Sequence, residues 1–186
     1  MSLPHIILGM LRKEPKSGYD LKKQFDNVIH YFWDTDLSRI YKTLDFMKNK
    51  GWVEFEYVVQ EESPNKKIYS VTEKGREELQ NWLAEPGKPM GHRNAFLAQL
   101  HFSDVIPADV QLHVLLKRLE TLRAQILELQ RRAEFLNIPI PLPKNALQVG
   151  LTREMFSLEY GIRRYQFEIE WTENIIRVLR SAPSDG

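Results

Sequence analysis

The most constraining feature of the sequence is a helical repeat that changes into a strand repeat within a few residues. Along residues 36–50 the apolar side chains step three and four positions apart, at Leu37, Ile40, Leu44 and Met47. This spacing predicts one buried helix face. Asp36 can cap the start of that helix, and Gly51 is typical of its end. Residues 53–60 alternate apolar and polar, and residues 67–71 follow after a Ser-Pro-Asn turn, which predicts a two-stranded hairpin.

Two shorter helical patterns precede this segment, and one follows it. The first covers residues 3–13, and the second begins at Ser17, where Asp20 three residues later predicts a capping box. A fourth helix is predicted after Thr72, with a buried face made of Leu79, Trp82 and Leu83. Three helices followed by a hairpin match the order of a winged helix-turn-helix, a mainly α fold with a small β-hairpin wing. In that fold the third helix enters the major groove of DNA, and the hairpin tip reaches the flanking backbone or minor groove.

The predicted third helix carries polar side chains opposite its apolar face, several of them near its N-terminal end. Arg39 can form two hydrogen bonds to guanine, Ser38 and Tyr41 can donate to phosphate or bases, and lysines neutralise phosphates. A single lysine is more often an ordinary solvated charge, but the set together falls where a winged helix touches a duplex. The residues predicted to contact DNA are Tyr19, Lys22, Ser38, Arg39, Tyr41, Lys42, Asn65, Lys66 and Lys67. The acidic Glu54, Glu56, Glu61 and Glu62 must then point away from phosphate.

The overall charge does not by itself indicate a nucleic-acid partner. The chain has 26 Lys and Arg against 25 Asp and Glu, a net charge of +1, so a DNA-binding surface must be a local basic patch. The absence of cysteine excludes disulfides and thiolate metal sites. The histidines form no HxxxH pair, and P-loop, dinucleotide-binding and G-x-S-x-G motifs are missing. We therefore expect no metal, no cofactor and no enzymatic activity.

The N-terminal residues predict a cytoplasmic protein. They include no basic stretch and no small-residue cleavage site, so a secretion signal is not expected. The apolar run at residues 6–11 is far shorter than the roughly 20 residues that span a bilayer. We therefore expect no contact with a membrane.

A stretch rich in Pro and Gly, residues 86–91, is predicted to link a winged-helix domain, residues 1–85, to a second domain, residues 92–186. In the second domain two long segments, 112–136 and 151–179, repeat apolar residues every three or four positions, as coiled coils do. We expect two helices that mediate dimerisation. The residues predicted to do so are Leu119, Leu122, Leu158, Ile162, Tyr165, Ile169, Ile176 and Leu179.

The last predicted helix has a second apolar stripe beside the first, made of Phe156, Tyr160, Phe167 and Trp171. Such a helix needs a second partner, which is either another subunit or a ligand cavity. A subunit contact is favoured, because a two-fold axis places two recognition helices about 34–36 Å apart on one face of DNA and so fits a palindromic operator. A small aromatic or hydrophobic effector would be expected near the domain junction, at Trp52, Trp82, Phe96 and Leu100.

Four stretches of the sequence resemble the PadR family of bacterial transcription regulators: residues 17–21, 38–44, 50–53 and 65–75. The segment from residue 92 onward is similar to the all-helical C-terminal domain of the longer family members. The resemblance implies a cytoplasmic homodimeric repressor, often released by a small molecule. It also implies that Tyr41 and its neighbours form the DNA-reading helix and that Lys66 and Lys67 belong to the wing. Asp36 departs from the family, which usually has Ser or Thr at this cap, and its charge would lie closer to phosphate.

Two functions remain open from the sequence. The favoured one is a sequence-specific, DNA-binding repressor that a small-molecule effector releases. The other is a winged-helix module that docks another protein and does not bind DNA directly. The two hypotheses differ in whether the protein has a salt-dependent affinity for DNA.

Overall fold

The computed structural model describes residues 2–58, 66–87 and 94–181. The chain divides into two compact units, Met1–Met90 and Gly91–Gly186, and each is described by itself. Of the predicted linker, residues 88–91 lie outside the described residues. No helix in the described ranges is both long enough and apolar enough to cross a membrane.

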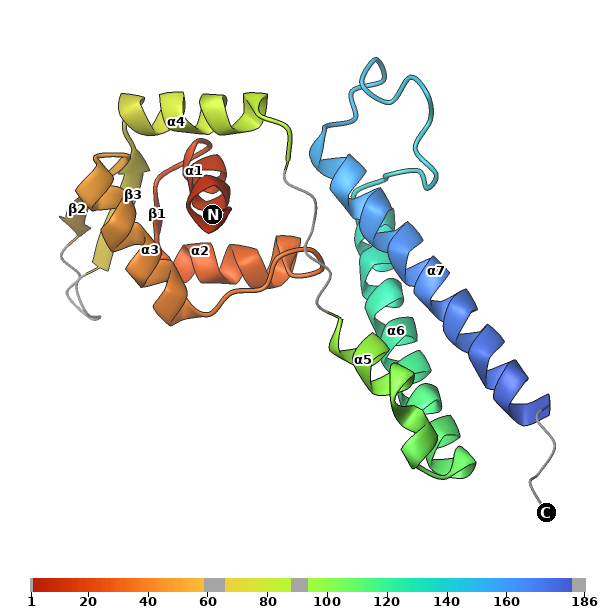
Figure 1. Ribbon diagram of the computed structural model, residues 1–186. Coiled ribbons are helices and arrows are strands. Elements are labelled where there is room, and N and C mark those ends of the chain that lie inside the picture. Colours follow the sequence, from red (N-terminus) through yellow and green to blue (C-terminus); the bar gives the residue numbers. More distant parts are fainter. Residues whose placement is uncertain (1, 59–65, 88–93, 182–186) are drawn as a thin grey trace. The chain divides into compact units, whose positions relative to one another are not determined.

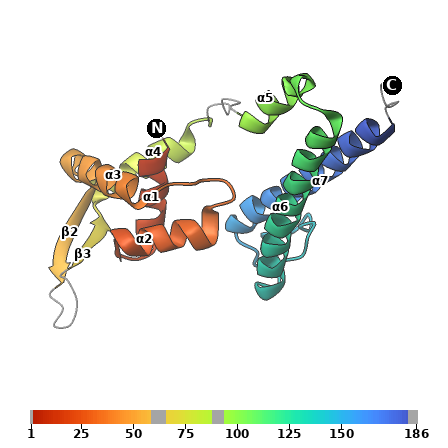
Figure 2. The same ribbon diagram turned by 90° about the horizontal axis from the view of Figure 1, so that it is seen from below.

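The first unit is a winged helix, as the sequence predicts (Figures 1 and 2). Its elements in chain order are α1 (Leu3–Leu11), β1 (Lys16–Ser17), α2 (Gly18–Gln24), a π-helical turn (Phe25–Ile29), α3 (Leu37–Lys50), β2 (Val53–Val58), β3 (Lys66–Val71) and α4 (Glu73–Ala84). The strands form an antiparallel sheet in the order β1-β3-β2. The sequence predicts only β2 and β3, because a strand of two residues is too short to show an alternating pattern.

The core of the first unit lies where α1, α2 and α3 meet the sheet. Its completely buried members include Ile7, Leu8 and Leu21 from the first two helices. The third helix contributes the predicted residues Ile40, Leu44 and Met47, which are all completely buried.

Three predicted core residues of the first unit lie outside this core instead. Leu37 is exposed because it is the first residue of α3, one turn before burial becomes complete at Ile40. On α4 only Leu79 is buried, while Trp82 and Leu83 are exposed in the last turn of the helix. The buried face of α4 is therefore shorter than the sequence predicts.

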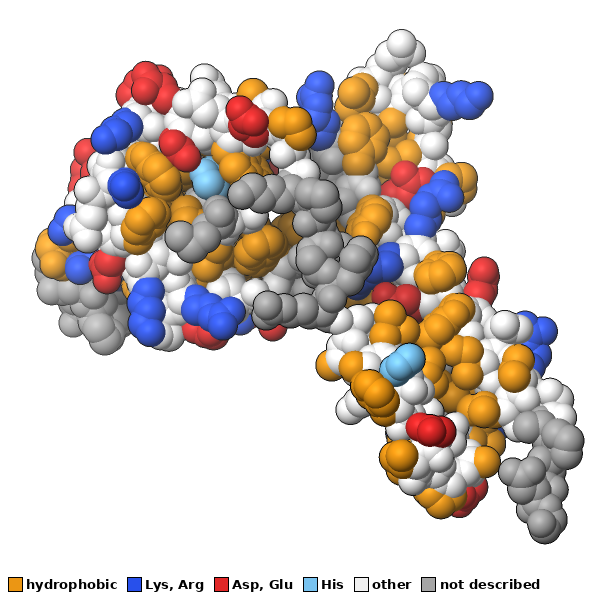
Figure 3. All heavy atoms as spheres, in the orientation of Figure 1, with side chains coloured by type: hydrophobic (Ala, Val, Ile, Leu, Met, Phe, Trp, Pro, Cys, Tyr) orange, Lys and Arg blue, Asp and Glu red, His pale blue; other side chains and the backbone are white. Residues whose placement is uncertain are grey.

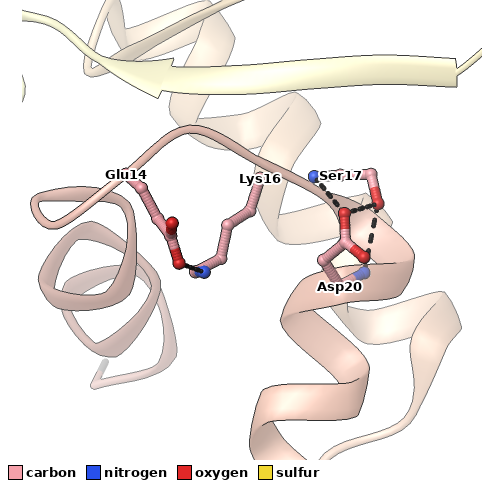
Figure 4. A network of polar contacts seen from close by, with 4 residues as sticks. All are labelled: Glu14, Lys16, Ser17 and Asp20. Atoms are coloured by element: carbon pink, nitrogen blue, oxygen red, sulfur yellow. Dashed lines mark hydrogen bonds and ion pairs between the residues drawn. The ribbon is translucent and has the colours of Figure 1, made fainter.

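Side-chain caps determine where α2, α3 and α4 begin. Figure 4 shows the capping box of α2, in which the Asp20 N–H donates to the Ser17 hydroxyl oxygen (3.1 Å) and the Ser17 N–H donates to the Asp20 carboxylate (3.2 Å). The Asp36 carboxylate caps α3, and the Thr72 hydroxyl oxygen caps α4. Gly51 ends α3 with φ of 71°, a left-handed conformation that glycine adopts without strain.

The Ser17 hydroxyl also acts on the charge of Asp20. It donates to the Asp20 carboxylate at 2.6 Å. This hydrogen bond is the main cause that holds the pKa of Asp20 below its ordinary value, with smaller contributions from Lys66 and Lys16. The cap is therefore strongest while Asp20 is ionised.

The second unit consists of two long antiparallel helices and a short segment before them. Its elements are α5 (Ala95–His101), a 3-10 turn (Ser103–Val105), α6 (Ala108–Phe135) and α7 (Glu154–Ser181). The helices α6 and α7 lie side by side (Figures 1 and 2). An ion pair joins Arg118 of α6 to Glu168 of α7 at 2.7 Å, and another joins Arg123 to Glu173 at 2.8 Å.

The packing of α6 on α7 corrects the predicted dimer interface. Six of the residues assigned to the contact between two chains are buried within one chain: Leu119, Leu122, Leu158, Ile162, Tyr165 and Ile176. The other two, Ile169 and Leu179, are partly buried and pack against the same core. A heptad pattern has the same spacing whether its partner is a second copy or another helix of the same chain, so the sequence could not distinguish the two.

We expect Ser17→Ala to lower the free energy of unfolding of the first unit by about 1 kcal/mol at neutral pH, because α2 loses its cap. Since the pKa of Asp20 is lowered in the folded state, part of this stability is present above the ordinary aspartate pKa and is lost as the pH falls through the lowered pKa. Urea denaturation should therefore show a smaller difference between wild type and variant in acid. A difference that stays constant down to about pH 3 would contradict the role of Asp20.

Candidate nucleic-acid interface

The predicted recognition residues lie on the exposed face of α3. Ser38, Arg39, Tyr41 and Lys42 are all exposed, opposite the buried side chains of the same helix. They lie in its first two turns, the part of a recognition helix that meets base edges. The helix is long enough to present them because the Asp36 cap and Gly51 define its ends.

Asp36 does more than cap the helix. Its carboxylate accepts the Arg39 N–H at 2.8 Å and also forms an ion pair with the Arg39 side chain, with 3.5 Å between Oδ2 and Nε. Both side chains are largely exposed, and such ion pairs contribute at most about 1 kcal/mol. Arg39 can therefore leave Asp36 for another acceptor at small cost.

Tyr41 joins α3 to the start of α2. Its ring lies directly against Gly18, the first residue of α2, and the residue is 41% exposed. Tyr19, the next residue of α2, is also exposed. The two tyrosines therefore belong to neighbouring elements of one surface.

The wing, made of β2 and β3, is attached to the same surface through β1. In the sheet Lys16 pairs with Tyr69 and Ser17 pairs with Ile68. Lys66 at the start of β3 is exposed and close enough to Asp20 to lower the pKa of that carboxyl. Strand pairing thus brings a predicted wing lysine close to the start of α2.

Lys67 is held by aromatic rings. Its ammonium lies 4.7 Å from the ring centroid of Phe55 and 5.6 Å from that of Tyr57, both on β2. These are distances at which a cation is attracted to the face of a ring. Lys48 of α3 lies 4.8 Å from the centroid of Phe55, so two cations lie close to this one ring.

The remaining predicted DNA contacts are Lys22 and Asn65. Lys22 forms an ion pair with Asp26 one turn later, and its side chain is partly buried, so it would have to exchange a carboxylate for a phosphate. Asn65 lies outside the described residues, and so do Glu61 and Glu62. The other two acidic residues of the prediction, Glu54 and Glu56, are exposed on β2.

The structure adds two residues that sequence reasoning did not select, Gly18 and Phe55. Gly18 lies in a stretch that resembles the PadR family, but its role could not be predicted because it depends on a residue 23 positions later in the chain. The alternation of β2 could have indicated Phe55, since the register pairs it with Tyr69 and pairs Tyr57 with Lys67. Strand neighbours of this kind interact across a sheet.

The predicted effector residues fall into the two units. In the first unit, the His5 ring stacks on Trp82 with 4.9 Å between centroids, lies 6.0 Å from Trp52 and contacts Glu78 at 3.0 Å. These contacts place His5 of α1 against Trp82 of α4, which stays 37% exposed, and near Trp52. We therefore interpret both tryptophans as packing residues between α1 and α4.

Phe96 and Leu100 belong to the second unit, where they line an apolar groove between α5 and α6. The groove has a volume of about 520 Å³, and Phe102, Ile106 and Val114 also line it. The Arg118 guanidinium holds α5 in place, because its carbon lies 3.7 Å from the ring centroid of Phe96. Figure 3 shows hydrophobic side chains gathered over this part of the second unit.

Comparison with known proteins agrees with this geometry. Residues 7–81 match the transcriptional regulator PadR-like family. Over 189 aligned residues the chain is 32% identical to a probable transcriptional regulator of Mycobacterium tuberculosis, and the match covers 97% of this chain and 98% of that protein. The chain belongs to the PadR-like family. Residues 92–180 of this PadR-like protein also match a second family, described as the virulence activator alpha C-terminal domain.

Two further comparisons concern one organism, Bacillus subtilis. Its negative transcriptional regulator PadR is 26% identical over 179 residues, which cover 95% of the present PadR-like chain and 97% of that protein. A crystal structure of Bacillus subtilis PadR in complex with operator DNA matches with a TM-score of 0.78 at 25% identity, over 96% of this chain and 99% of that chain. The likeness extends over both units, so it includes the helical second half as well as the winged helix.

Proposed function

We propose that this PadR-like protein is a sequence-specific DNA-binding transcription regulator that acts in the cytoplasm as a homodimeric repressor. The observation that carries the proposal is the joining of the exposed face of α3, the start of α2 and the wing into one surface through Gly18 and β1. The Bacillus subtilis relative, described as a negative regulator and crystallised with operator DNA, supports both binding and repression. A module that docks only other proteins has no such support.

The side chains of this surface are suited to different parts of DNA. Arg39 is suited to guanine, because a guanidinium can donate two hydrogen bonds to one base edge. Ser38 and Tyr41 can donate to phosphate or to bases, while Lys42, Lys66 and Lys67 neutralise phosphates. Since the whole chain carries only +1, a DNA-binding surface must be a local basic patch, and we assign the affinity to these side chains.

The dimer contact is proposed to lie on the second apolar stripe of α7. Phe156, Tyr160 and Phe167 are 43%, 55% and 65% exposed within one chain, although they step along one side of the helix. Covering them with a second copy removes apolar surface from water. Two-fold symmetry would then present two copies of α3 to a palindromic operator, with half-sites about 34–36 Å apart.

A small aromatic or hydrophobic effector is proposed to bind in the groove between α5 and α6. Two of its lining residues, Phe96 and Leu100, are ones that the sequence assigns to an effector. Of the polar lining residues, Ser103 and Gln111 are engaged with Leu100, Ile106 and each other. Apart from Gln99 the other lining residues are apolar, which favours an apolar ligand.

Arg39→Ala should weaken operator binding by about 1–3 kcal/mol and relax base preference at one position. Lys42→Ala should weaken binding to all sequences alike and lower the slope of log affinity against log salt by about 0.9. Fluorescence anisotropy at several salt concentrations, on a fragment selected from genomic DNA, measures both effects. Arg76→Ala, an exposed arginine on α4, is the matched control. Unchanged binding in both test variants would remove the basis for the DNA assignment.

Asp36→Asn should tighten DNA binding several-fold without changing the thermal unfolding midpoint. Asparagine caps a helix as well as aspartate does, so α3 keeps its start. The substitution removes a carboxylate that pairs with Arg39 and that lies where phosphates approach. Titration at low and high salt should show the gain shrinking as salt rises. Weaker binding by a variant that unfolds at the same temperature as wild type would mean that the carboxylate aids recognition.

Replacing Phe156 and Phe167 together by serine should convert the dimer to a monomer in light scattering, with helix content retained in circular dichroism. Both side chains are exposed in one chain, so their loss should affect the contact between copies more than the fold. Phe135→Ser is the matched control, because this phenylalanine is 84% exposed at the end of α6, outside the stripe. A double variant that stays dimeric at the same concentration would exclude this stripe as the interface.

A further inference from the structure

Gly18 is buried beneath the ring of Tyr41. A Cβ built on Gly18 would lie 2.5 Å from Cε1, 2.7 Å from Cζ and 3.0 Å from the hydroxyl oxygen of Tyr41. Atoms cannot approach so closely, so no other residue type leaves the Tyr41 ring where it is. The hydroxyl-bearing edge of the ring therefore has its place only because position 18 lacks a side chain.

Backbone conformation does not require glycine at this position. Gly18 is the first residue of α2, and it is not among the glycines with positive φ. A non-glycine residue can adopt such a conformation, and alanine is the better helix former. The reason for glycine at position 18 is therefore the contact with Tyr41.

Tyr41 also interacts electrostatically with the wing. Tyr69 of β3 is buried, and the nearby Asp45 and Tyr41 of α3 add to the effect of burial in raising its pKa. Tyr41 thus lies against the start of α2 and within electrostatic range of Tyr69, and it is still 41% exposed. The close approach of Gly18 restricts the ring on the side of α2.

We propose that Gly18 is a positioning residue for DNA binding: it seats the Tyr41 ring against the start of α2, so that the phenol hydroxyl meets the duplex at a fixed place relative to α2 and the wing. This inference rests on the proposed function. Gly18 itself contacts no DNA in this proposal and acts only through Tyr41. This role differs from core packing. The atoms that would clash with a larger residue belong to the far end of the Tyr41 side chain, which can rotate away.

Gly18→Ala is therefore expected to separate stability from binding. The Tyr41 ring should move aside and the unit should fold with an unfolding midpoint equal to or above that of wild type, since alanine favours the helix. Operator affinity should fall about tenfold, the usual effect of losing one hydrogen bond to a charged group. The salt slope should stay unchanged, because a phenol releases no counterions.

The experiment compares wild type, Gly18→Ala, Tyr41→Ala and the double variant by anisotropy titration on one selected operator fragment. If Gly18 acts through Tyr41, the double variant should bind no more weakly than Tyr41→Ala alone. Gly9→Ala is the matched control, because Gly9 lies in α1 with nothing within 4 Å of its added Cβ. This control should bind as wild type does.

Three results would overturn the inference. Wild-type affinity in Gly18→Ala would show that the position of the Tyr41 ring against Gly18 does not matter for binding. Equal losses from Gly18→Ala with and without Tyr41 would show that alanine acts through another contact. No salt-dependent DNA binding by the wild-type protein would remove the proposed function and this inference together, whereas the first two results leave the function intact.

Discussion

The pairing of β1 with β3 is the interaction on which the candidate surface depends. Ser17 belongs both to the sheet and to the cap of α2, because its backbone pairs with Ile68 and its side chain caps the helix. One residue therefore ties the first turn of α2 to the wing. The ring of Tyr41 closes the third side by resting on Gly18. The recognition helix, α2 and the wing are thus joined to one another by direct contacts.

The second unit depends on a different constraint: two amphipathic helices must each bury an apolar face. Each of α6 and α7 satisfies one apolar face against the other, with Leu115 and Ile162 almost completely buried. Among the apolar surfaces left exposed are the part of α7 that faces away from α6 and the groove beside α5. The packing of α6 on α7 within one chain therefore determines which surfaces stay exposed for a second copy and for a ligand.

Much of the fold could be predicted because its signals are local. Caps such as Asp36 and the stop at Gly51 act within one turn of the chain, and the three-residue and four-residue steps of α3 depend only on helix geometry. Features that depend on distant residues could not be predicted. The strand β1 exists because β3 offers hydrogen bonds, and Gly18 matters because of Tyr41.

The candidate site shows the same division. Ser38, Arg39 and Lys42 follow from helix periodicity, since the face opposite a buried stripe must be exposed. The pairing of Lys22 with Asp26 was readable from their spacing, but whether a lysine prefers that partner or a phosphate depends on its surroundings. The eight residues assigned to dimerisation could not be divided between intrachain and interchain packing from the sequence. Apolar side chains are buried equally well against a helix of the same chain or of another chain.

The rings around Lys67 have a consequence for the thermodynamics of the proposed complex. A free lysine loses up to about 2 kcal/mol of rotamer entropy when it is ordered. Lys67 has already lost part of that freedom on folding, because Phe55 and Tyr57 restrain its ammonium. Less disorder then remains to be removed when a phosphate arrives. In this respect the wing is prepared for its ligand before contact, and the folding of β2 and β3 bears part of the entropic cost of association.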